Sequence, residues 1–353
     1  MSRITVSVIW LNYNSAKFIN IAKESLRSIY MSSIPLELVL VDNASTDGSF
    51  EEIKTYISRL DEKDFKVKSI GLNKNLGYTG GNNIGYLNSD PEVKYVAFIN
   101  NDLILYENSL ERIIQHLDVH KDVGIAQGII YDIGGKHIDN AGFICTETLL
   151  NIAIRRSINK PVYVTYASGA YMVVRRELLS KLGVPFDWDG FMYFDDMPLG
   201  FKVWSMGFKV VSLPIEAGRH FGGASGGLIS EKTVYYMYRG WGMLIEASNT
   251  RFKGLLKKLF LKDIPIINGF KNPRLLKSAI KGFMDGLSLG RKKRESGYSL
   301  DIYSAPLVAK YNLLSLLLPN RLVSGRVDIT LANTDGSGKL LELRKFSNLG
   351  TLD

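Results

Sequence analysis

Asparagine and aspartate side chains follow several strand-like runs of this 353-residue chain, at the points where those runs end. The clusters are Asn12-Tyr13-Asn14, Asp42-Asn43-Ala44-Ser45-Thr46-Asp47-Gly48 and Asn100-Asn101-Asp102. Carboxylate oxygens are hard ligands of the kind that Mg²⁺ and Mn²⁺ take in proteins. Any one cluster alone is ordinary turn chemistry that ends a strand. All of them at one edge of a sheet would be harder to explain as turns.

Further along the chain, two neighbouring carboxylates and one histidine could also do chemistry. Asp195 and Asp196 follow the aromatic run 191–194, and His220 precedes a glycine-rich stretch. A carboxylate in such a pair can act as a general base, but acidic residues at a helix start are also favoured by the helix dipole alone. The stretch 77–83 lacks both the spacing of a dinucleotide fingerprint and the Lys-Ser/Thr of a P-loop.

Alternating strands and helices must position these groups. Apolar, β-branched runs predict strands at 5–11, 36–41, 67–71 and 95–99. Amphipathic spacing predicts helices at 16–30 and 50–60, the second capped by Ser45 or Thr46. This order predicts an α/β fold with a mostly parallel sheet and helices on both faces. Ligands of such sheets bind beyond the carboxyl ends of the strands, so the polar clusters should converge on one pocket.

The rest of the chain predicts a strand pair within 162–174, helices at 175–182 and up to 206, and a strand at 209–213. A helical pattern follows from 234 to 318, and Asp335-Gly336 indicates a hairpin within 326–346. We therefore expect a catalytic domain at 1–235, a basic amphipathic helical segment at 236–320 and a tail at 321–353.

Composition narrows the class of protein. Hydrophobic residues make up 46% and charged residues 22%, which is ordinary globular usage. The lone Cys145 predicts a buried structural thiol, and the first ten residues predict a strand and no signal peptide. The net charge is +9, but residues 251–294 hold 13 Lys and Arg against two Asp, so that segment carries +11 and the remainder −2. The basicity therefore belongs to the helical segment.

Together, the motif blocks resemble glycosyltransferase family 2 with the GT-A fold, the rhamnosyltransferase-like inverting enzymes included. The resemblance rests on 11–14, on 41–49, on the Asn- and Gly-rich 73–85 and on 100–102, and it extends to about residue 230, roughly two-thirds of the chain. It implies a Rossmann-like catalytic domain that binds a nucleotide-sugar donor.

The resemblance also implies a donor site. Asp42 would accept hydrogen bonds from the base, and Tyr13 would offer the base an aromatic face. The glycines of 77–83 would let backbone amides approach a pyrophosphate, a plain loop being the alternative. The implied donor-binding residues are Leu11, Tyr13, Asp42, Asn75, Gly77, Gly80, Gly81, Asn82, Asn100 and Asn101.

Metal and catalytic roles follow from the same resemblance. Asp102 would bind Mg²⁺ or Mn²⁺, with His220 completing the coordination; Asn100, where the family often has Asp, lowers the charge of the site. Asp196 would be the general base of inversion and Asp195 would place the acceptor. Pro198 and Lys202 depart from the family pattern, which often has Asp and Arg at these positions.

The basic segment 251–318 mixes apolar and cationic residues at helical spacing, as helices at an anionic membrane surface do; a packed bundle with a solvated basic face is the alternative. We expect a cytoplasmic protein at the inner face of the cell membrane that acts on a glycan or lipid-linked acceptor and binds no nucleic acid. A nucleotidyltransferase of similar fold and a non-catalytic nucleotide-sugar or membrane-binding scaffold remain alternative functions.

Overall fold

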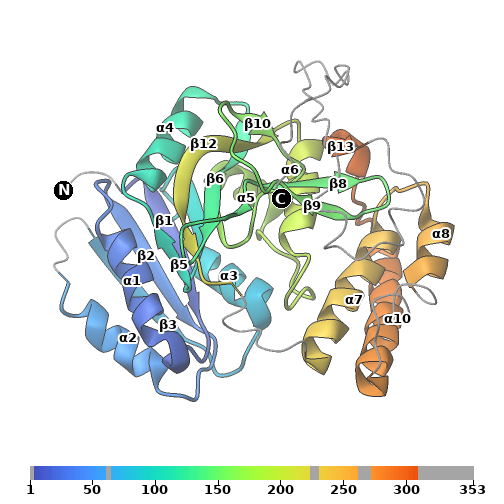
Figure 1. The fold of residues 1–353 in the computed structure, drawn as a ribbon, viewed down its shortest axis with the longest axis horizontal. Coiled ribbons are helices and arrows are strands. Elements are labelled where there is room, and N and C mark those ends of the chain that lie inside the picture. The colour runs from blue at the N-terminus through green and yellow to red at the C-terminus, as the bar shows by residue number, and fades with distance from the viewer. Residues whose placement is uncertain (1–3, 61–64, 223–229, 261–271, 309–353) are drawn as a thin grey trace.

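The computed structural model describes residues 4–60, 65–222, 230–260 and 272–308. Within these ranges, ten strands form one sheet in the order β10-β12-β6-β11-β4-β1-β2-β3, with β5 beside β12 and β7 beside β6 (Figure 1). Its strands are β1 (Val6–Asn12), β2 (Leu36–Asp42), β3 (Phe65–Gly71), β4 (Tyr95–Asn100), β5 (Leu103–Leu105), β6 (Val123–Asp132), β7 (Ile138–Asn140), β10 (Val162–Tyr163), β11 (Tyr171–Arg175) and β12 (Lys209–His220).

The sheet is mixed but mostly parallel, which confirms the predicted fold class. β4, β1, β2 and β3 run parallel to one another, and so do β6 and β12. β11 lies between β4 and β6 and is antiparallel to both. Because β11 is reversed, the turn that precedes it, including Gly169, lies at the same sheet edge as the carboxyl ends of β4 and β6.

Helices cover both faces of the sheet and enclose two cores. On one face, apolar residues of α1 (Ile19–Tyr30), α2 (Ser49–Ile57) and α4 (Ser109–Val119) pack on side chains such as Val8 and Trp10. On the other face, α3 (Gly77–Leu87), α5 (Arg176–Leu182) and α6 (Asp196–Ser205) pack on Ile9 and Val39. The alternation along β1 sends Val8 and Trp10 to one side and Ile9 to the other, as a strand buried on both faces requires.

The C-terminal helices pack beside the sheet and extend the second core (Figure 1). They are α7 (Glu231–Ala247), α8 (Lys253–Lys258) and α10 (Pro273–Glu295). A small antiparallel pair, β8 (Phe143–Thr146) and β9 (Asn151–Ala153), is joined by β13 (Leu307–Val308). Short 3-10 turns lie at Ala16–Phe18 and Ile302–Ser304. Among the described residues, no helix combines the length and the apolar composition that crossing a bilayer requires.

The helices α7 and α10 run in the same direction and touch backbone to backbone. A methyl group on Gly282, Gly286 or Gly290 would overlap backbone atoms of Tyr235, Arg239 or Met243, respectively. Both series advance by four residues per contact, so the helices are parallel and both amino-terminal ends lie at one end of the pair. Small residues at this spacing allow close helix approach.

Several local predictions are wrong. The plain loop that was the alternative for 77–83 does not form, because these residues open helix α3, with Gly80 under Leu76 and Gly81 under Leu11 of β1. β10 and β11 pair with other strands and not with each other. Neither Ser45 nor Thr46 caps α2, which follows Gly48 at φ 81°. β13 interrupts the helical pattern predicted up to 318, and the predicted hairpin and tail lie outside the described residues.

Candidate active site

A cavity of about 260 Å³ lies at the carboxyl ends of β1 and β4. It is closed on its other sides by the start of α3, the end of β12 and the start of α7. Eight predicted site residues line it: Leu11, Tyr13, Asn75, Gly77, Asn100, Asn101, Asp102 and His220. The predicted convergence of strand ends on one pocket is therefore observed for β1 and β4, and Asn43, directly after β2, also lines the cavity.

The end of β2 contributes differently, because the carboxylate of Asp42 is turned into the loop that follows it. Asp42 is 3% exposed and does not line the cavity. Its Oδ1 accepts from Asn12 Nδ2 at 2.8 Å and from the Ser45 hydroxyl at 2.6 Å, and its Oδ2 accepts from the Ser45 amide at 2.8 Å. Four lone pairs minus these three bonds leave one acceptor position. Tyr13, in contrast, is 36% exposed and its ring is open to a partner.

The glycines of α3 bring this helix close to the cavity. Gly77 has φ 72°, and a side chain there would overlap the carbonyl oxygen of Phe191. Gly81 lies directly under Leu11 of β1. Gly80, Gly81 and Asn82 lie in the buried part of the helix and do not line the cavity, so of the predicted glycines only Gly77 faces it.

Asp102 and His220 are neighbours because β5 and β12 pair with His220 opposite Leu103. His220 Nε2 lies 3.2 Å from Asp102 Oδ1, and His220 Nδ1 lies 3.6 Å from Asp139 Oδ2. Burial lowers the pKa of His220, but hydrogen bonds and attraction from the two carboxylates outweigh it and raise the pKa to about 9. The site therefore favours a positive charge.

This arrangement fits a divalent cation in part. A metal-binding imidazole usually donates its other ring N–H to a carboxylate, and Asp139, 3.6 Å from Nδ1, is placed to accept it. Within the described ranges, however, no group of three or more His, Cys, Asp or Glu side chains is arranged to hold a metal ion. Asp102 and His220 alone would leave the remaining positions to ligand oxygens and water.

The acidic pair lies deeper, beside the cavity. Asp195 precedes α6 and Asp196 is its first residue, as predicted. The carboxylate of Asp196 is half-buried and accepts from the amides of Gly169 and Met197, both at 3.0 Å. Burial raises the pKa of Asp196 to about 6 against the opposing effect of these bonds. Tyr78, which lines the cavity, donates to the carbonyl of Gly169 at 2.7 Å and so connects the two places.

Asp195 has an environment unlike that of its neighbour. It is 9% exposed, and burial followed by the negative charges of Asp196 and Asp187 raises its pKa well above the usual range. Three residues just before it, Phe191, Tyr193 and Phe194, have φ of 69°, 68° and 57°. Left-handed conformations are strained for bulky side chains and persist only where the surroundings impose them.

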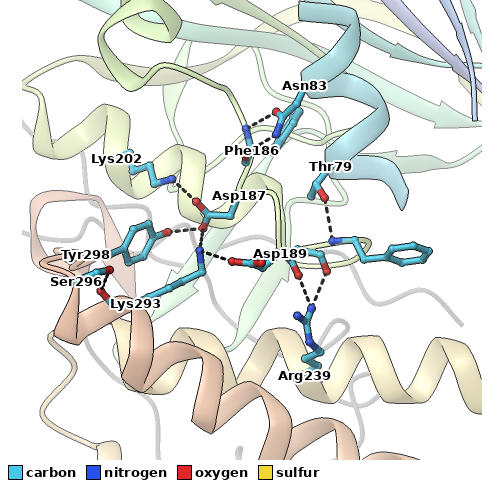
Figure 2. Close-up of polar contacts among 12 residues, drawn as sticks. Thr79, Asn83, Phe186, Asp187, Asp189, Lys202, Arg239, Lys293, Ser296 and Tyr298 are labelled. Carbon is cyan, nitrogen blue, oxygen red and sulfur yellow. Dashed lines mark hydrogen bonds and ion pairs between the residues drawn. The ribbon is translucent and has the colours of Figure 1, made fainter. Parts of the chain in front are cut away.

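Figure 2 shows what imposes the conformation of this loop. Asn83 of α3 bonds both the amide and the carbonyl of Phe186, at 3.0 and 2.8 Å. Asp187 receives Lys202 Nζ at 2.9 Å and the Tyr298 hydroxyl at 2.6 Å, with Lys293 Nζ at 4.0 Å. Burial would raise the pKa of Asp187, but Lys202 and Lys293 hold it below its usual value.

The loop is also held by α7 and by the start of α3. Arg239 donates to the carbonyl oxygens of Asp189 and Gly190, and the amide of Phe191 donates to the Thr79 hydroxyl at 2.9 Å. We call 186–194 the acidic-pair loop. It connects the C-terminal helices with the carboxylates at 195 and 196.

The sequence patterns did not single out several residues of this site. Asp139 is distant in sequence and carries no motif, and Lys232 and Thr233 belong to a helix that reads as part of the C-terminal segment. Phe191 stacks on Tyr236 with ring centroids 4.4 Å apart, under Lys232 Nζ at 4.9 Å. The aromatic run 191–194 could have indicated Phe191 as a site residue. No such pattern marks Asp139, Lys232 or Thr233.

Comparison with known proteins adds independent information. A family model described as glycosyl transferase family 2 matches residues 7–183. No curated protein matches the chain. Among solved structures, the mannosyltransferase PcManGT from Pyrobaculum calidifontis in complex with GDP-Man and Mn²⁺ is similar, with a TM-score of 0.51 and 18% identity over 92% of this chain and 84% of that one.

Two further solved structures have comparable folds. GalNAc-T7 with UDP, GalNAc and Mn²⁺ has a TM-score of 0.56 and 14% identity, covering 84% of this chain and 59% of that chain. TarS 1-349 from S. aureus in complex with UDP-GlcNAc has a TM-score of 0.50 and 16% identity, covering 83% and 92%. At these identities the likeness is one of fold.

Proposed function

Because this chain belongs to glycosyl transferase family 2, we propose that it is an inverting enzyme that moves a sugar from a UDP-, dTDP- or GDP-activated donor to a glycan or lipid-linked acceptor. The observation that carries the proposal is the single cavity in which Tyr13, Asn100, Asp102 and His220 meet. The family match favours sugar transfer over nucleotidyl transfer. Rhamnosyltransferase-like specificity falls within the proposal.

In the proposed donor complex, the base lies against Tyr13 and Leu11, and the diphosphate lies near Gly77, Asn75, Asn100 and Asn101. The exposed ring of Tyr13 supports this placement of the base. Asp42 has one acceptor position left for an imide N–H and otherwise orders the loop after β2. Gly81 supports the site through close packing of α3 on Leu11 of β1, and Gly80 packs under Leu76. Asn82 donates to the carbonyl oxygen of Tyr78, which lines the cavity.

We propose that Asp102 and His220 hold a Mg²⁺ or Mn²⁺ ion together with the donor diphosphate. The similar structures of PcManGT and GalNAc-T7 both contain Mn²⁺. Such an ion supplies charge stabilisation to a departing nucleoside diphosphate. The carboxylates of Asp102 and Asp139 around His220 already favour positive charge there.

Asp196 is the proposed general base, which takes the proton of the attacking acceptor hydroxyl. A base works best when its pKa lies near the operating pH, and the pKa of Asp196 is raised to about 6. The amides of Gly169 and Met197 fix the orientation of the carboxylate. Asp195, whose raised pKa favours the protonated form, can donate a hydrogen bond and is the proposed acceptor-placing residue.

The helices after about residue 235 form the proposed membrane-proximal segment of a cytoplasmic protein acting at the inner face of the cell membrane. Their excess of Lys and Arg over residues 251–294 supports contact with anionic lipid. The proposed division at 235/236 falls inside α7, which begins at Glu231, and buried residues of α7, α8 and α10 share one hydrophobic core with the sheet.

A thermal-shift panel tests the central proposal. UDP-, dTDP- and GDP-sugars are added with and without Mn²⁺, since a ligand that binds only the folded state raises the melting temperature; saturation at about 100 Kd contributes about 2.7 kcal/mol. We expect one nucleotide class to stabilise the protein, and more strongly with Mn²⁺. If no nucleotide sugar raises the melting temperature with either Mg²⁺ or Mn²⁺, the proposal is wrong.

A further inference from the structure

A second cavity, an open groove of about 720 Å³, lies between the first turns of α7 and α10. Its cationic lining residues are Lys232 of α7 and Arg274, Lys277 and Lys281 of α10. Arg274, Lys277 and Lys281 recur at helical spacing and therefore share one face of α10. Tyr235, Tyr236, Ser278 and Glu231 form the rest of the wall, so the groove combines positive charge with aromatic rings and hydroxyl groups.

The positive charge of the groove is largely uncompensated. Glu231 is the one carboxylate that lines it among the described residues, and Asp285, behind the wall, accepts from the Tyr235 hydroxyl at 2.7 Å. All four cationic side chains are exposed, and none forms an ion pair with a carboxylate in the described part of the chain. Lys281 Nζ instead lies 5.9 Å from the ring of Tyr235.

The parallel packing of α7 and α10 strengthens this field. Both helices begin at the groove, and the amino-terminal end of a helix carries a partial positive charge. The glycine contacts fix the two helices at close range, so the cations of both are held around one space. Four side-chain cations in a concave surface concentrate the field further.

The groove adjoins the donor cavity. Lys232 lines both, and Tyr236 of the groove stacks on Phe191 of the donor cavity. A ligand in the groove would therefore lie next to the place where the donor sugar is transferred. A multiply charged anion with some length fits this shape and charge better than a neutral glycan does.

We propose that the groove binds a phosphate group of the acceptor, so that the acceptor of this enzyme is phosphate-bearing. The inference rests on the proposed glycosyltransferase function and names the acceptor class for that function. The phosphate can belong to a lipid headgroup at the membrane surface or to a soluble phosphorylated glycan. In either case Arg274, Lys277 and Lys281 hold the anion, and Lys232 lies between it and the donor.

The test compares two variants of the full chain that each lose two exposed positive charges from α10. K277Q/K281Q removes charge at the groove, and R291Q/K292Q removes the same charge at the far end of the helix. Inorganic pyrophosphate in EDTA-containing buffer is the soluble probe, measured by calorimetry. Vesicles of phosphatidylcholine with and without phosphatidylglycerol are the lipid probe, measured by co-sedimentation.

We expect K277Q/K281Q to weaken binding of at least one probe about 30-fold, since each of the two cations contributes about 1 kcal/mol near an anionic surface. R291Q/K292Q should stay within about twofold of the wild type. Loss confined to pyrophosphate assigns the phosphate to a soluble acceptor, and loss confined to anionic vesicles assigns it to lipid. If both variants lose probe binding equally, or neither loses any, the proposal that the groove binds phosphate is wrong. The thermal shift with nucleotide sugars, measured on the same samples, reports separately on the donor site.

Discussion

The carboxylate of Asp196 is subject to two opposing effects. Two backbone amides donate to it, which stabilises the charged form, and burial destabilises the charged form more strongly, so its pKa rises to about 6. The result is a carboxylate that is ionised at neutral pH yet basic enough to take a proton. Burial and the negative charges of Asp196 and Asp187 raise the pKa of its neighbour Asp195, which favours the protonated form of that carboxyl group.

Asp196→Asn should keep donor binding and lose transfer by about 10²- to 10⁴-fold, the usual contribution of a general base. Because the base must be deprotonated, kcat/KM of the wild type should fall tenfold per pH unit below a pKa of about 6 and level off above it. Initial rates from pH 4.5 to 8 and a parallel thermal shift with donor measure both. The control is Asp122→Asn. Asp122 is exposed and directly precedes β6, at the sheet edge opposite the cavity. An active Asp196→Asn would exclude it as the base.

The proposed metal pair predicts a graded series of variants. Asp102→Asn should abolish the additional thermal shift that Mn²⁺ gives to donor binding, because it removes the one carboxylate of the pair. Asp139→Asn should weaken Mn²⁺ about 10- to 100-fold, as loss of a residue that orients a ligating imidazole does. With EDTA, the thermal shift that the donor gives the wild-type protein should fall to the value seen with Asp102→Asn. Equal Mn²⁺ affinity in Asp102→Asn and wild type would contradict the assignment.

For individual residues of the site, the sequence predicted only those positions that a local pattern marks. Asn100, Asn101 and Asp102 lie at the end of a strand that the sequence predicts. Because the carboxyl ends of parallel strands share one edge of the sheet, the alternation of strands and helices was enough to predict that these residues lie near the end of β1. The position of Asp139 depends on the return of β7 along β6, for which its own sequence carries no mark. The orientation of Asp42 toward its own loop likewise depends on Asn12 and Ser45, which no periodicity reveals.

At the scale of elements, the pair α7 and α10 determines how the C-terminal part attaches. Its apolar and basic periodicity predicted helices, and these are present. The direction of packing was not predictable from that periodicity, because it depends on which backbone each glycine faces. α3 and β13 show the same limit. The alternative of a plain loop at 77–83 is replaced by a helix in which Gly81 packs under Leu11. Two residues of the predicted helical pattern form β13, because they pair with the edge of β8.

Gly286→Ala should lower the free energy of unfolding by about 1–3 kcal/mol, as overpacking does, because its methyl group would overlap the Arg239 carbonyl. Urea denaturation followed by circular dichroism measures the change. Gly254→Ala is the matched control: it is also helical, nothing lies within 4 Å of its added methyl group, and it should be neutral or stabilising by up to about 1 kcal/mol. Similar effects of the two substitutions would argue against tight α7–α10 packing.

At the scale of the whole molecule, the helical segment and the catalytic sheet are connected through the acidic-pair loop. Asp187 of that loop forms ion pairs with Lys202 of α6 and with Lys293 in the last turn of α10. It also accepts a hydrogen bond from Tyr298, which follows α10 (Figure 2). Lys202, a departure from the family pattern, thereby has a defined role here. A ligand or membrane that moves the helices would act on the loop through these bonds.

Tyr298→Phe should therefore affect both stability and turnover. Loss of a hydrogen bond to a charged group costs about 1.5–3 kcal/mol, and a loosened loop should lower kcat while leaving donor KM nearly unchanged. Unfolding curves and steady-state kinetics measure the two effects. Tyr303→Phe is the control: this exposed hydroxyl accepts a long bond of 3.4 Å from the Arg251 amide and bonds to no charged group among the residues that the structure describes, so both values should stay close to the wild type. A change in stability with no change in kcat would show that the contact is structural only.

The left-handed backbone at Phe191, Tyr193 and Phe194 has a consequence for the protein's evolution. At position 193, glycine or asparagine would relieve this strain and leave the approach to Asp195 less defined. At 191 and 194 the same change would also remove the ring contacts with Tyr236 and Trp241. Selection for heat tolerance and selection for turnover should therefore favour opposite residues at position 193, and a library randomised there would separate into stable, slow variants and less stable, fast ones.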